Sequence, residues 1–102
     1  MSETLFTAIA EPSRRRILDL LRAGERSAGA IGGVLALSQP GVSKHLRVLR
    51  EAGLVHVRGD AQRRLYSLRP EPLATLDAWL TPYRAFWEGR LDALEDHLNG
   101  EA

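Results

Sequence analysis

The hydrophobic and polar positions along the chain predict four helices, a β-hairpin and a long final helix. In the helical stretches apolar residues recur every three or four positions, whereas in the hairpin they alternate imperfectly with polar ones. The expected helices span about residues 3–10, 12–23, 27–35, 39–52 and 71–98, and the hairpin spans 54–68. Neither a repeat nor a low-complexity linker interrupts this order. Residues 1–102 are therefore expected to form a single, mainly α domain.

Residues with known preferences mark the ends of the helices. Pro12 suits the first turn of the second helix, where its missing N–H costs nothing. Gly24 and Gly53 follow the second and fourth helices and favour the left-handed conformation that ends a helix. Ser27 and Ser38 stand where an N-cap is needed, because a serine side chain accepts a hydrogen bond from a free backbone N–H. These residues set the predicted boundaries of the second, third and fourth helices.

The third helix is rich in glycine. Ile31, Val34 and Leu35 form its expected buried stripe. Each glycine weakens a helix by about 1 kcal/mol relative to alanine. The glycines of this helix are Gly29, Gly32 and Gly33. Such a segment is either mobile or packed too closely for side chains to fit, and close packing is the expectation here.

The fourth helix presents two different faces. At about 100° per residue, Val42, Leu46 and Leu49 point to one side and form the buried face. The broadly opposite side carries Gln39, Pro40, Ser43, Lys44 and Arg47. Long donors and a short hydroxyl beside a small glycine can enter a major groove and meet base edges and phosphates. This face is therefore a candidate DNA-reading surface.

The hairpin predicts a basic wing beside that helix. Its turn signal is Gly59-Asp60, and arginines flank the turn at Arg58, Arg63 and Arg64. Basic side chains on a projecting turn suit contact with phosphates or a minor groove. The alternative is an ordinary solvated turn.

Composition and charge narrow the function further. Residues 1–69 hold twelve basic and six acidic side chains, whereas residues 70–102 hold two and seven, so one part of the fold is suited to a polyanion. With no cysteine, disulfides and thiolate metal sites are excluded. No apolar run approaches the roughly 18 residues of a membrane span, and the first residues do not resemble a secretory signal. A cytoplasmic protein without a membrane partner is expected.

The last helix carries an apolar stripe too broad for a lone surface helix. The stripe includes Trp79, Tyr83, Phe86, Trp87, Leu91, Leu94 and Leu98. A partner subunit would cover it, and tryptophans suit an interface anchor; alternatively, both tryptophans lie in the core of the protomer. The same aromatic residues could border an effector pocket. Thr81-Pro82 predicts a kink, or a cap and a restart, because an interior proline removes a backbone hydrogen bond.

Three stretches resemble the ArsR/SmtB family of bacterial winged helix-turn-helix repressors. They read FTAIAEPSRRRILDLL, LSQPGVSKHLRVLREAGLV and RRLYSL, and the resemblance runs from about Leu5 to Leu98. It implies a winged helix-turn-helix fold with five to six helices and a two-stranded antiparallel wing. It also implies a homodimer that binds an imperfect palindrome in double-stranded DNA and blocks transcription until an effector, here unassigned, releases it.

The resemblance assigns roles to particular residues. Gln39, Ser43 and Lys44 fall at positions that read bases, Arg47 resembles a phosphate or base contact, and the wing arginines resemble backbone contacts. The full set of expected DNA-binding residues is Gln39, Pro40, Ser43, Lys44, His45, Arg47, Arg50, Arg58, Arg63 and Arg64. In this family the terminal helices, here about 3–10 and 71–98, form the dimer interface. The expected interface residues are Leu5, Phe6, Ile9, Trp79, Tyr83, Phe86, Trp87, Leu91 and Leu94.

The metal chemistry of the family does not carry over. The third helix reads SAGAIGGVL and offers no thiolate ligand. Where other members place ligands on the last helix, only Asp77 matches, and Trp79, Arg90 and Ala93 replace the rest. A lone aspartate does not hold zinc tightly. The histidines are expected to be structural or close to DNA; they are His45, His56 and His97. No metal or cofactor is expected.

Other function classes fit the sequence less well. The chain has no P-loop, no Gly-x-Ser-x-Gly and no paired histidine motif, so an enzyme is not expected. The tripeptide Arg58-Gly59-Asp60 in a chain without an export signal is a coincidence rather than an adhesion motif. RNA is disfavoured because the narrow major groove of an A-form duplex excludes a helix. The main alternative is a winged-helix module that binds protein rather than DNA, which the arginines of the wing and the fourth helix disfavour.

Overall fold

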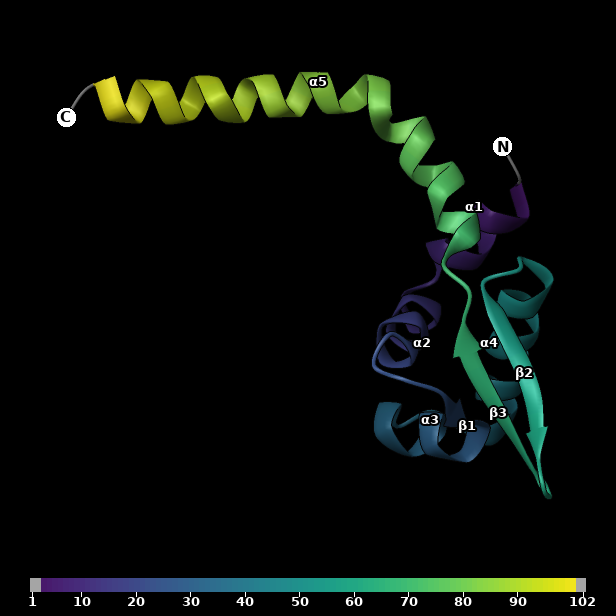
Figure 1. The fold of residues 1–102 in the computed structure, drawn as a ribbon. Helices are drawn as coiled ribbons and strands as arrows, with labels where there is room; N and C mark the ends of the chain where they lie inside the picture. Colours follow the sequence, from purple (N-terminus) through teal and green to yellow (C-terminus); the bar gives the residue numbers. More distant parts are fainter. Residues whose placement is uncertain (1–2, 101–102) are drawn as a thin grey trace.

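The computed structural model describes residues 3–100, and of residues 92 and 93 it describes the backbone alone. Within this range the fold is mainly helical with a small antiparallel sheet, as predicted. The elements are α1 (Glu3–Ala10), α2 (Pro12–Leu21), β1 (Arg26–Ser27), α3 (Ala28–Leu35), α4 (Gln39–Glu51), β2 (Val55–Asp60), β3 (Arg63–Leu68) and α5 (Glu71–Gly100). Figure 1 shows α1 to α4 gathered around the sheet, while α5 leaves this body and runs away from it.

The N-caps predicted at Ser27 and Ser38 and the stop predicted at Gly53 are confirmed. The stop predicted at Gly24 is wrong, because α2 ends at Leu21 with a right-handed cap residue and Gly24 has φ +145°, outside the left-handed helical range. The Ser27 hydroxyl accepts from the Ala30 N–H at 3.1 Å, and the Ser38 hydroxyl accepts from the Gly41 N–H at 3.2 Å. Gly53 has φ +75° after α4, a conformation that costs a glycine little. One cap was missed: the Glu11 carboxylate accepts from the Arg14 N–H at 3.1 Å and so caps α2.

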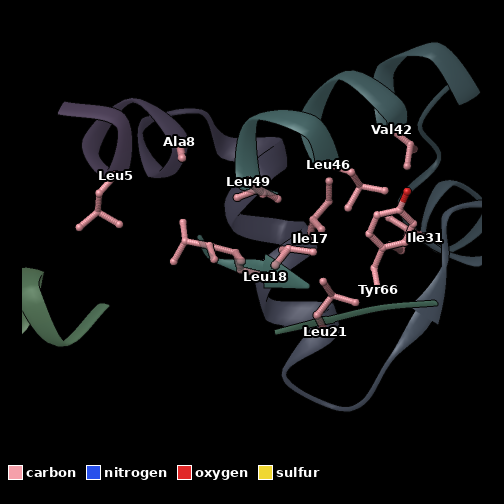
Figure 2. Close-up of a cluster of buried hydrophobic side chains, with 12 residues drawn as sticks. Leu5, Ala8, Ile17, Leu18, Leu21, Ile31, Val42, Leu46, Leu49 and Tyr66 are labelled. Carbon is pink, nitrogen blue, oxygen red and sulfur yellow. The ribbon is translucent and has the colours of Figure 1, made fainter. Parts of the chain in front are cut away.

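The core lies between the helices and the sheet. Ile17, Ile31, Leu46 and Leu49 are fully buried, together with Leu54 after α4. Figure 2 shows side chains of α1, α2, α3 and α4 converging with Tyr66 of β3. The apolar face of α4 therefore fixes the helix against the body and leaves its opposite face outward.

Close packing around α3 is confirmed at one glycine only. A Cβ at Gly32 would lie 3.1 Å from the Leu37 carbonyl oxygen and 3.4 Å from Val42 Cγ2, so a side chain there would need its neighbours to shift by a few tenths of an ångström. A Cβ at Gly33 would meet nothing within 4 Å. The prediction that Val34 is buried is wrong, since it is 63% exposed. Ile31 and Leu35, four residues apart, make the inward face of this short helix.

The sheet has three strands rather than two, in the order β1-β3-β2, all antiparallel. Two residues carry no alternating pattern, so β1 could not be recognised from the sequence. The predicted Gly59-Asp60 turn is also wrong. Both residues belong to β2, where Asp60 is opposite Arg63 in the register, and the chain reverses through residues 61 and 62, with Ala61 at φ +56°.

α5 is one helix of 30 residues with Pro82 inside it. Figure 1 shows a bend in its first half, so the proline kinks the helix and does not restart it. The Thr81 hydroxyl donates to the Asp77 carbonyl oxygen at 3.3 Å, a contact that accompanies bent helices. Before the bend, α5 packs on α1 through an edge-to-face contact of Phe6 and Trp79, with ring centroids 5.8 Å apart. None of the helices described is long and apolar enough to cross a membrane.

Candidate nucleic-acid interface

The outer face of α4 is exposed as the sequence predicts. Val42, Leu46 and Leu49 are buried at 1% exposure or less, which fixes the rotation of the helix. The side chains on the opposite side are all exposed: Gln39, Pro40, Ser43, Lys44 and Arg47. Two amide or hydroxyl side chains and two cations thus share one open surface that protein atoms do not fill.

Four of the predicted DNA-binding cations have no hydrogen-bond or ion-pair partner among residues 3–100. They are Lys44, Arg47, Arg50 and Arg64. Three lie on α4 and one lies on β3 of the wing. An exposed cation without an internal partner can contact a phosphate without first breaking a hydrogen bond or an ion pair. These four side chains are therefore the strongest phosphate candidates.

Arg58 is not free in the same way. Its Nε donates to Glu25 Oε2 at 3.0 Å and its Nη2 donates to Glu25 Oε1 at 2.5 Å. Arg58 of β2 is opposite Leu65 of the central strand β3, and Glu25 directly precedes β1 on the other side of β3, so this two-point ion pair reaches across the central strand. The hydrogen bonds from Arg58 lower the pKa of Glu25. Arg58 is therefore engaged across the sheet, and its predicted contact with DNA would require it to leave Glu25.

Arg63 is also occupied in this structure. Its Nη2 donates to Asp60 Oδ2 at 3.0 Å across the wing turn. Both side chains are largely exposed, and exposed ion pairs of this kind contribute little. Arg63 could therefore exchange Asp60 for a phosphate more easily than Arg58 could leave Glu25.

His45 points inward rather than towards a groove. Its side chain is 17% exposed, and Nδ1 lies 3.3 Å from Arg14 Nη1 and 3.8 Å from Glu11 Oε2. The expected role of His45 as a direct DNA contact therefore has no support from its placement. His56, on β2, lies 3.4 Å from Arg69 Nη2, and this contact is exposed.

Three consecutive arginines at the start of α2 have roles that sequence reasoning missed. Arg14 donates to the carbonyl oxygens of Thr7 and Ala8, and Arg15 donates to those of Ile9 and Ala10. Arg16 donates to the Leu35 carbonyl oxygen at 3.2 Å. These bonds satisfy free carbonyls at the C-terminal ends of α1 and α3. Two features of the sequence could have predicted these contacts with α1. That helix has no basic residue in its own last turn, and a single residue separates it from α2, so the arginines of α2 lie close to its free carbonyls.

α5 exposes a continuous apolar face that begins at Trp79 and continues along the far part of the helix, by which we mean the part after Pro82. The exposed apolar residues on α5 are Trp79, Tyr83, Phe86, Trp87, Leu91, Leu94 and Leu98. Phe86 is 71% exposed, and past the bend Figure 1 shows nothing packed on the helix. The alternative that both tryptophans lie in the protomer core is thus wrong. Phe6 and Ile9 of α1 are half-buried, whereas Leu5 is 3% exposed and belongs to the core, which removes it from the expected interface.

Two hollows adjoin these surfaces. One, of about 340 Å³, is lined by Trp79, Leu80, Tyr83, Phe86, Trp87 and Arg90 of α5. The other, of about 370 Å³, lies at the turn between α3 and α4 and includes Gly29, Gly33 and Gln39 in its lining. The first comes from one helix alone, so its shape depends on whatever covers α5.

The residues described offer no assembled metal site. No group of three or more His, Cys, Asp or Glu side chains lies together within the described range. Asp77, the one residue that matches a ligand position of the family, forms an ion pair with Arg84. Its carboxylate thus already has a partner.

Known proteins are similar to this chain in both sequence and fold. A family model described as a helix-turn-helix domain matches residues 9–58. The transcriptional repressor SdpR of Bacillus subtilis is 37% identical over 76 residues, which cover 74% of this chain and 84% of that protein. The crystal structure of a possible transcriptional regulator for arsenical resistance is 39% identical, with a TM-score of 0.73 over 91% of this chain and 96% of that one.

A third likeness concerns the assembly as well as the fold. The homodimeric winged helix-turn-helix DNA-binding domain of a possible ArsR-family regulator from Mycobacterium bovis is 32% identical, with a TM-score of 0.65. The similarity covers 78% of this chain and 74% of that domain. Together with the outward face of α4 and the wing beside it, these likenesses show that the chain belongs to the ArsR family of winged helix-turn-helix transcriptional regulators.

Proposed function

We propose that this DNA-binding regulator acts as a homodimeric repressor of an operator with two-fold symmetry. The outer face of α4 enters the major groove in each half-site, and the wing contacts the flanking backbone. With a two-fold axis, the two copies of α4 meet successive major grooves about 34 Å apart. Bound in this way, the dimer occludes a promoter on the bacterial chromosome, and hence works in the cytoplasm.

The observation that carries the proposal is the outer face of α4 with its unpaired cations. Gln39 and Ser43 are the base-reading residues, since an amide and a hydroxyl can discriminate base edges. Lys44 and Arg47 lie beside them and reach bases or phosphates. Arg50, in the last turn of α4, and Arg64, on β3 of the wing, complete the set of unpaired cations and are proposed as phosphate contacts.

The dimer is proposed to form through the far part of α5 together with α1. Burial of exposed apolar surface contributes roughly 25 cal/mol per Å², so a row of leucines and aromatic rings favours a covered state strongly. The row lies next to Phe6 of α1, which already contacts Trp79. A second copy presents the same row, as a two-fold interface requires. The homodimeric relative from Mycobacterium bovis supports this choice of partner.

An effector other than a thiolate-bound metal is proposed to govern release. With no cysteine in the chain, a thiolate site is impossible. The hollow lined by Trp79, Tyr83, Phe86, Trp87 and Arg90 would be closed by a partner subunit, so an apolar effector is the class that it would accept. Zinc at buffered levels is accordingly expected to leave DNA affinity unchanged.

A selection followed by a salt titration tests the function. Random duplexes enriched by the protein should converge on a symmetric sequence, and the affinity for the winning duplex is then measured by fluorescence anisotropy over a range of salt. If between half and all of the four unpaired cations of each protomer engage, the logarithm of affinity falls with the logarithm of salt with a slope between about −3.5 and −7. No enrichment and a slope near zero would instead favour a protein-binding module.

A further inference from the structure

We infer that Arg14 is a positioning residue for DNA reading, because it holds α4, through His45, to the C-terminal end of α1. The inference rests on the proposed function, since it concerns how accurately α4 is presented to DNA. Arg14 itself is 9% exposed and does not reach the outer face of α4.

The guanidinium of Arg14 connects two elements that are far apart in the chain. On one side Nε donates to the Ala8 carbonyl oxygen at 2.7 Å and Nη2 donates to the Thr7 carbonyl oxygen at 2.8 Å. On the other side Nη1 lies 3.3 Å from His45 Nδ1. A planar fork with fixed donor directions holds its acceptors at a fixed mutual angle, which a flexible ammonium group would not.

The contact depends on where His45 carries its proton. A guanidinium can only donate, so Arg14 and His45 form a hydrogen bond in the tautomer whose Nδ1 is unprotonated and whose ring proton lies on Nε2. The nearby Glu11 carboxylate, 3.8 Å from Nδ1, caps α2 through the Arg14 N–H. His45 is therefore held by the α1–α2 corner, between Lys44 and Leu46 on the helix that reads DNA.

Stability alone is a poor explanation for this arrangement. Burying a cation carries a desolvation cost, and apolar side chains of similar size usually serve packing at least as well. What an apolar residue could not do is fix the angle between α1 and α4. α1 is also the helix whose Phe6 contacts Trp79 of α5, so the same corner links the proposed dimer surface to the DNA-reading surface.

The experiment measures discrimination rather than affinity alone. For each variant, anisotropy gives the ratio of affinities for the selected duplex and for a scrambled duplex of equal length. Arg14→Gln is expected to lower this ratio about tenfold, the equivalent of one hydrogen bond involving a charged group. Arg15→Gln is the control, because Arg15 holds the same end of α1 but makes no hydrogen bond or ion pair with α4 among the residues that the structure describes. It should leave the ratio unchanged.

Variants of His45 test the other side of the contact. His45→Leu removes the acceptor and should lower the ratio as Arg14→Gln does, whereas His45→Asn keeps an acceptor near the Nδ1 position and should retain it. Arg14→Gln combined with His45→Leu should be no worse than either change alone, whereas a direct contact of His45 with DNA would make the two effects add. If Arg14→Gln fails to fold by circular dichroism, the His45 pair decides.

The inference is overturned by additive effects, by equal behaviour of the two His45 variants, or by an Arg15→Gln change as large as that of Arg14→Gln. Those outcomes differ from a failure of the proposed function. In that case the wild-type protein itself selects no sequence, and its ratio for any two duplexes stays near one.

Discussion

Arginine serves two separate purposes in this protein, and the position of each side chain decides which. Arg14, Arg15 and Arg16 turn back onto helix ends and satisfy carbonyl oxygens. Arg47 and Arg64, by contrast, have no partner within the part of the chain that the structure describes. A count of basic residues therefore overstates the charge available to DNA, and the unpaired side chains are the ones to test.

The residues that read bases should differ in effect from those that hold the backbone. Gln39→Ala and Ser43→Ala are each expected to reduce discrimination against one changed base pair by about 1–3 kcal/mol, the worth of a good base contact. Affinity for unrelated sequences should change little, since neither side chain is charged. Competition anisotropy with single-base variants of the selected duplex measures this. Uniform weakening on all sequences would assign both residues to the backbone instead.

The two wing arginines that differ most in pairing make a matched test. Arg64→Ala should weaken binding to every sequence and make the salt slope of the dimer shallower by about 2, because each protomer loses one phosphate contact. Arg58→Ala should leave the slope almost unchanged, since its guanidinium is engaged by Glu25. Salt titrations of both variants on one duplex decide the matter. Equal loss of slope would show that Arg58 leaves Glu25 when DNA arrives.

Releasing Arg58 should give DNA a new contact. The pKa of Glu25 lies below its ordinary 4.5 because Arg58 hydrogen-bonds the charged form. A lowered pKa means that the stabilisation is present above 4.5 and is lost only as pH falls through the lowered value, so acidification near neutrality does not open the pair. Glu25→Gln removes the charged carboxylate and so frees Arg58, and the salt slope of the dimer should then steepen by up to about 2. An unchanged slope would show that Arg58 cannot reach DNA.

Among the elements, the turn from α3 to α4 is closely fitted. Gly32 lies against the Leu37 carbonyl oxygen and Val42, whereas Gly33, the next residue, faces open space. The turn sets where α4 begins and hence where Gln39 stands. Crowding at Gly32 would act on the DNA-reading helix directly.

Alanine substitutions separate close packing from helix propensity. Gly33→Ala should raise the free energy of unfolding by about 1 kcal/mol, because alanine is the better helix former and its Cβ meets nothing. Gly32→Ala should lower it by about 1–2 kcal/mol, since overpacking against backbone outweighs the same gain. Urea denaturation of the two variants measures both values. A stabilising Gly32→Ala would mean that the turn yields easily.

How far the sequence predicts each element depends on how local its signals are. Caps at Ser27 and Ser38 and the stop at Gly53 depend on neighbouring residues, and all three predictions are confirmed. The Arg58–Glu25 pair joins residues 33 positions apart, and β1 exists only because β3 lies beside it. Such features arise from tertiary contacts. The outer face of α4 was predictable because its opposite side had to be buried.

At the scale of the whole molecule, the far part of α5 is the least self-sufficient part of the structure. The molecule extends over 62 Å in one direction and 20 Å in another. Much of the long dimension is the arm seen in Figure 1, which carries its apolar face into solvent. A single protomer therefore cannot bury the apolar surface that its own sequence places on α5.

A charge placed in the apolar face should break the dimer. Leu91→Glu is expected to weaken dimerisation about 100-fold or more, because both copies lose a buried leucine and would bury a carboxylate in its place. Ala85→Glu adds the same side chain on the opposite side of the helix by its spacing and serves as the control. Sedimentation velocity over a range of concentrations measures the dissociation constants. Equal effects of the two variants would move the interface elsewhere.

Because the far part of α5 is covered only in the dimer, operator occupancy depends on the concentration of the protomer. Below the dissociation constant of the dimer, the number of functional dimers falls with the square of the protomer concentration. Occupancy of an operator by such a dimer therefore responds more steeply to copy number than that of a monomeric binder would. A modest rise in the synthesis of this chain would therefore shift an operator from mostly free to mostly occupied, and a modest rise in its proteolysis would do the reverse.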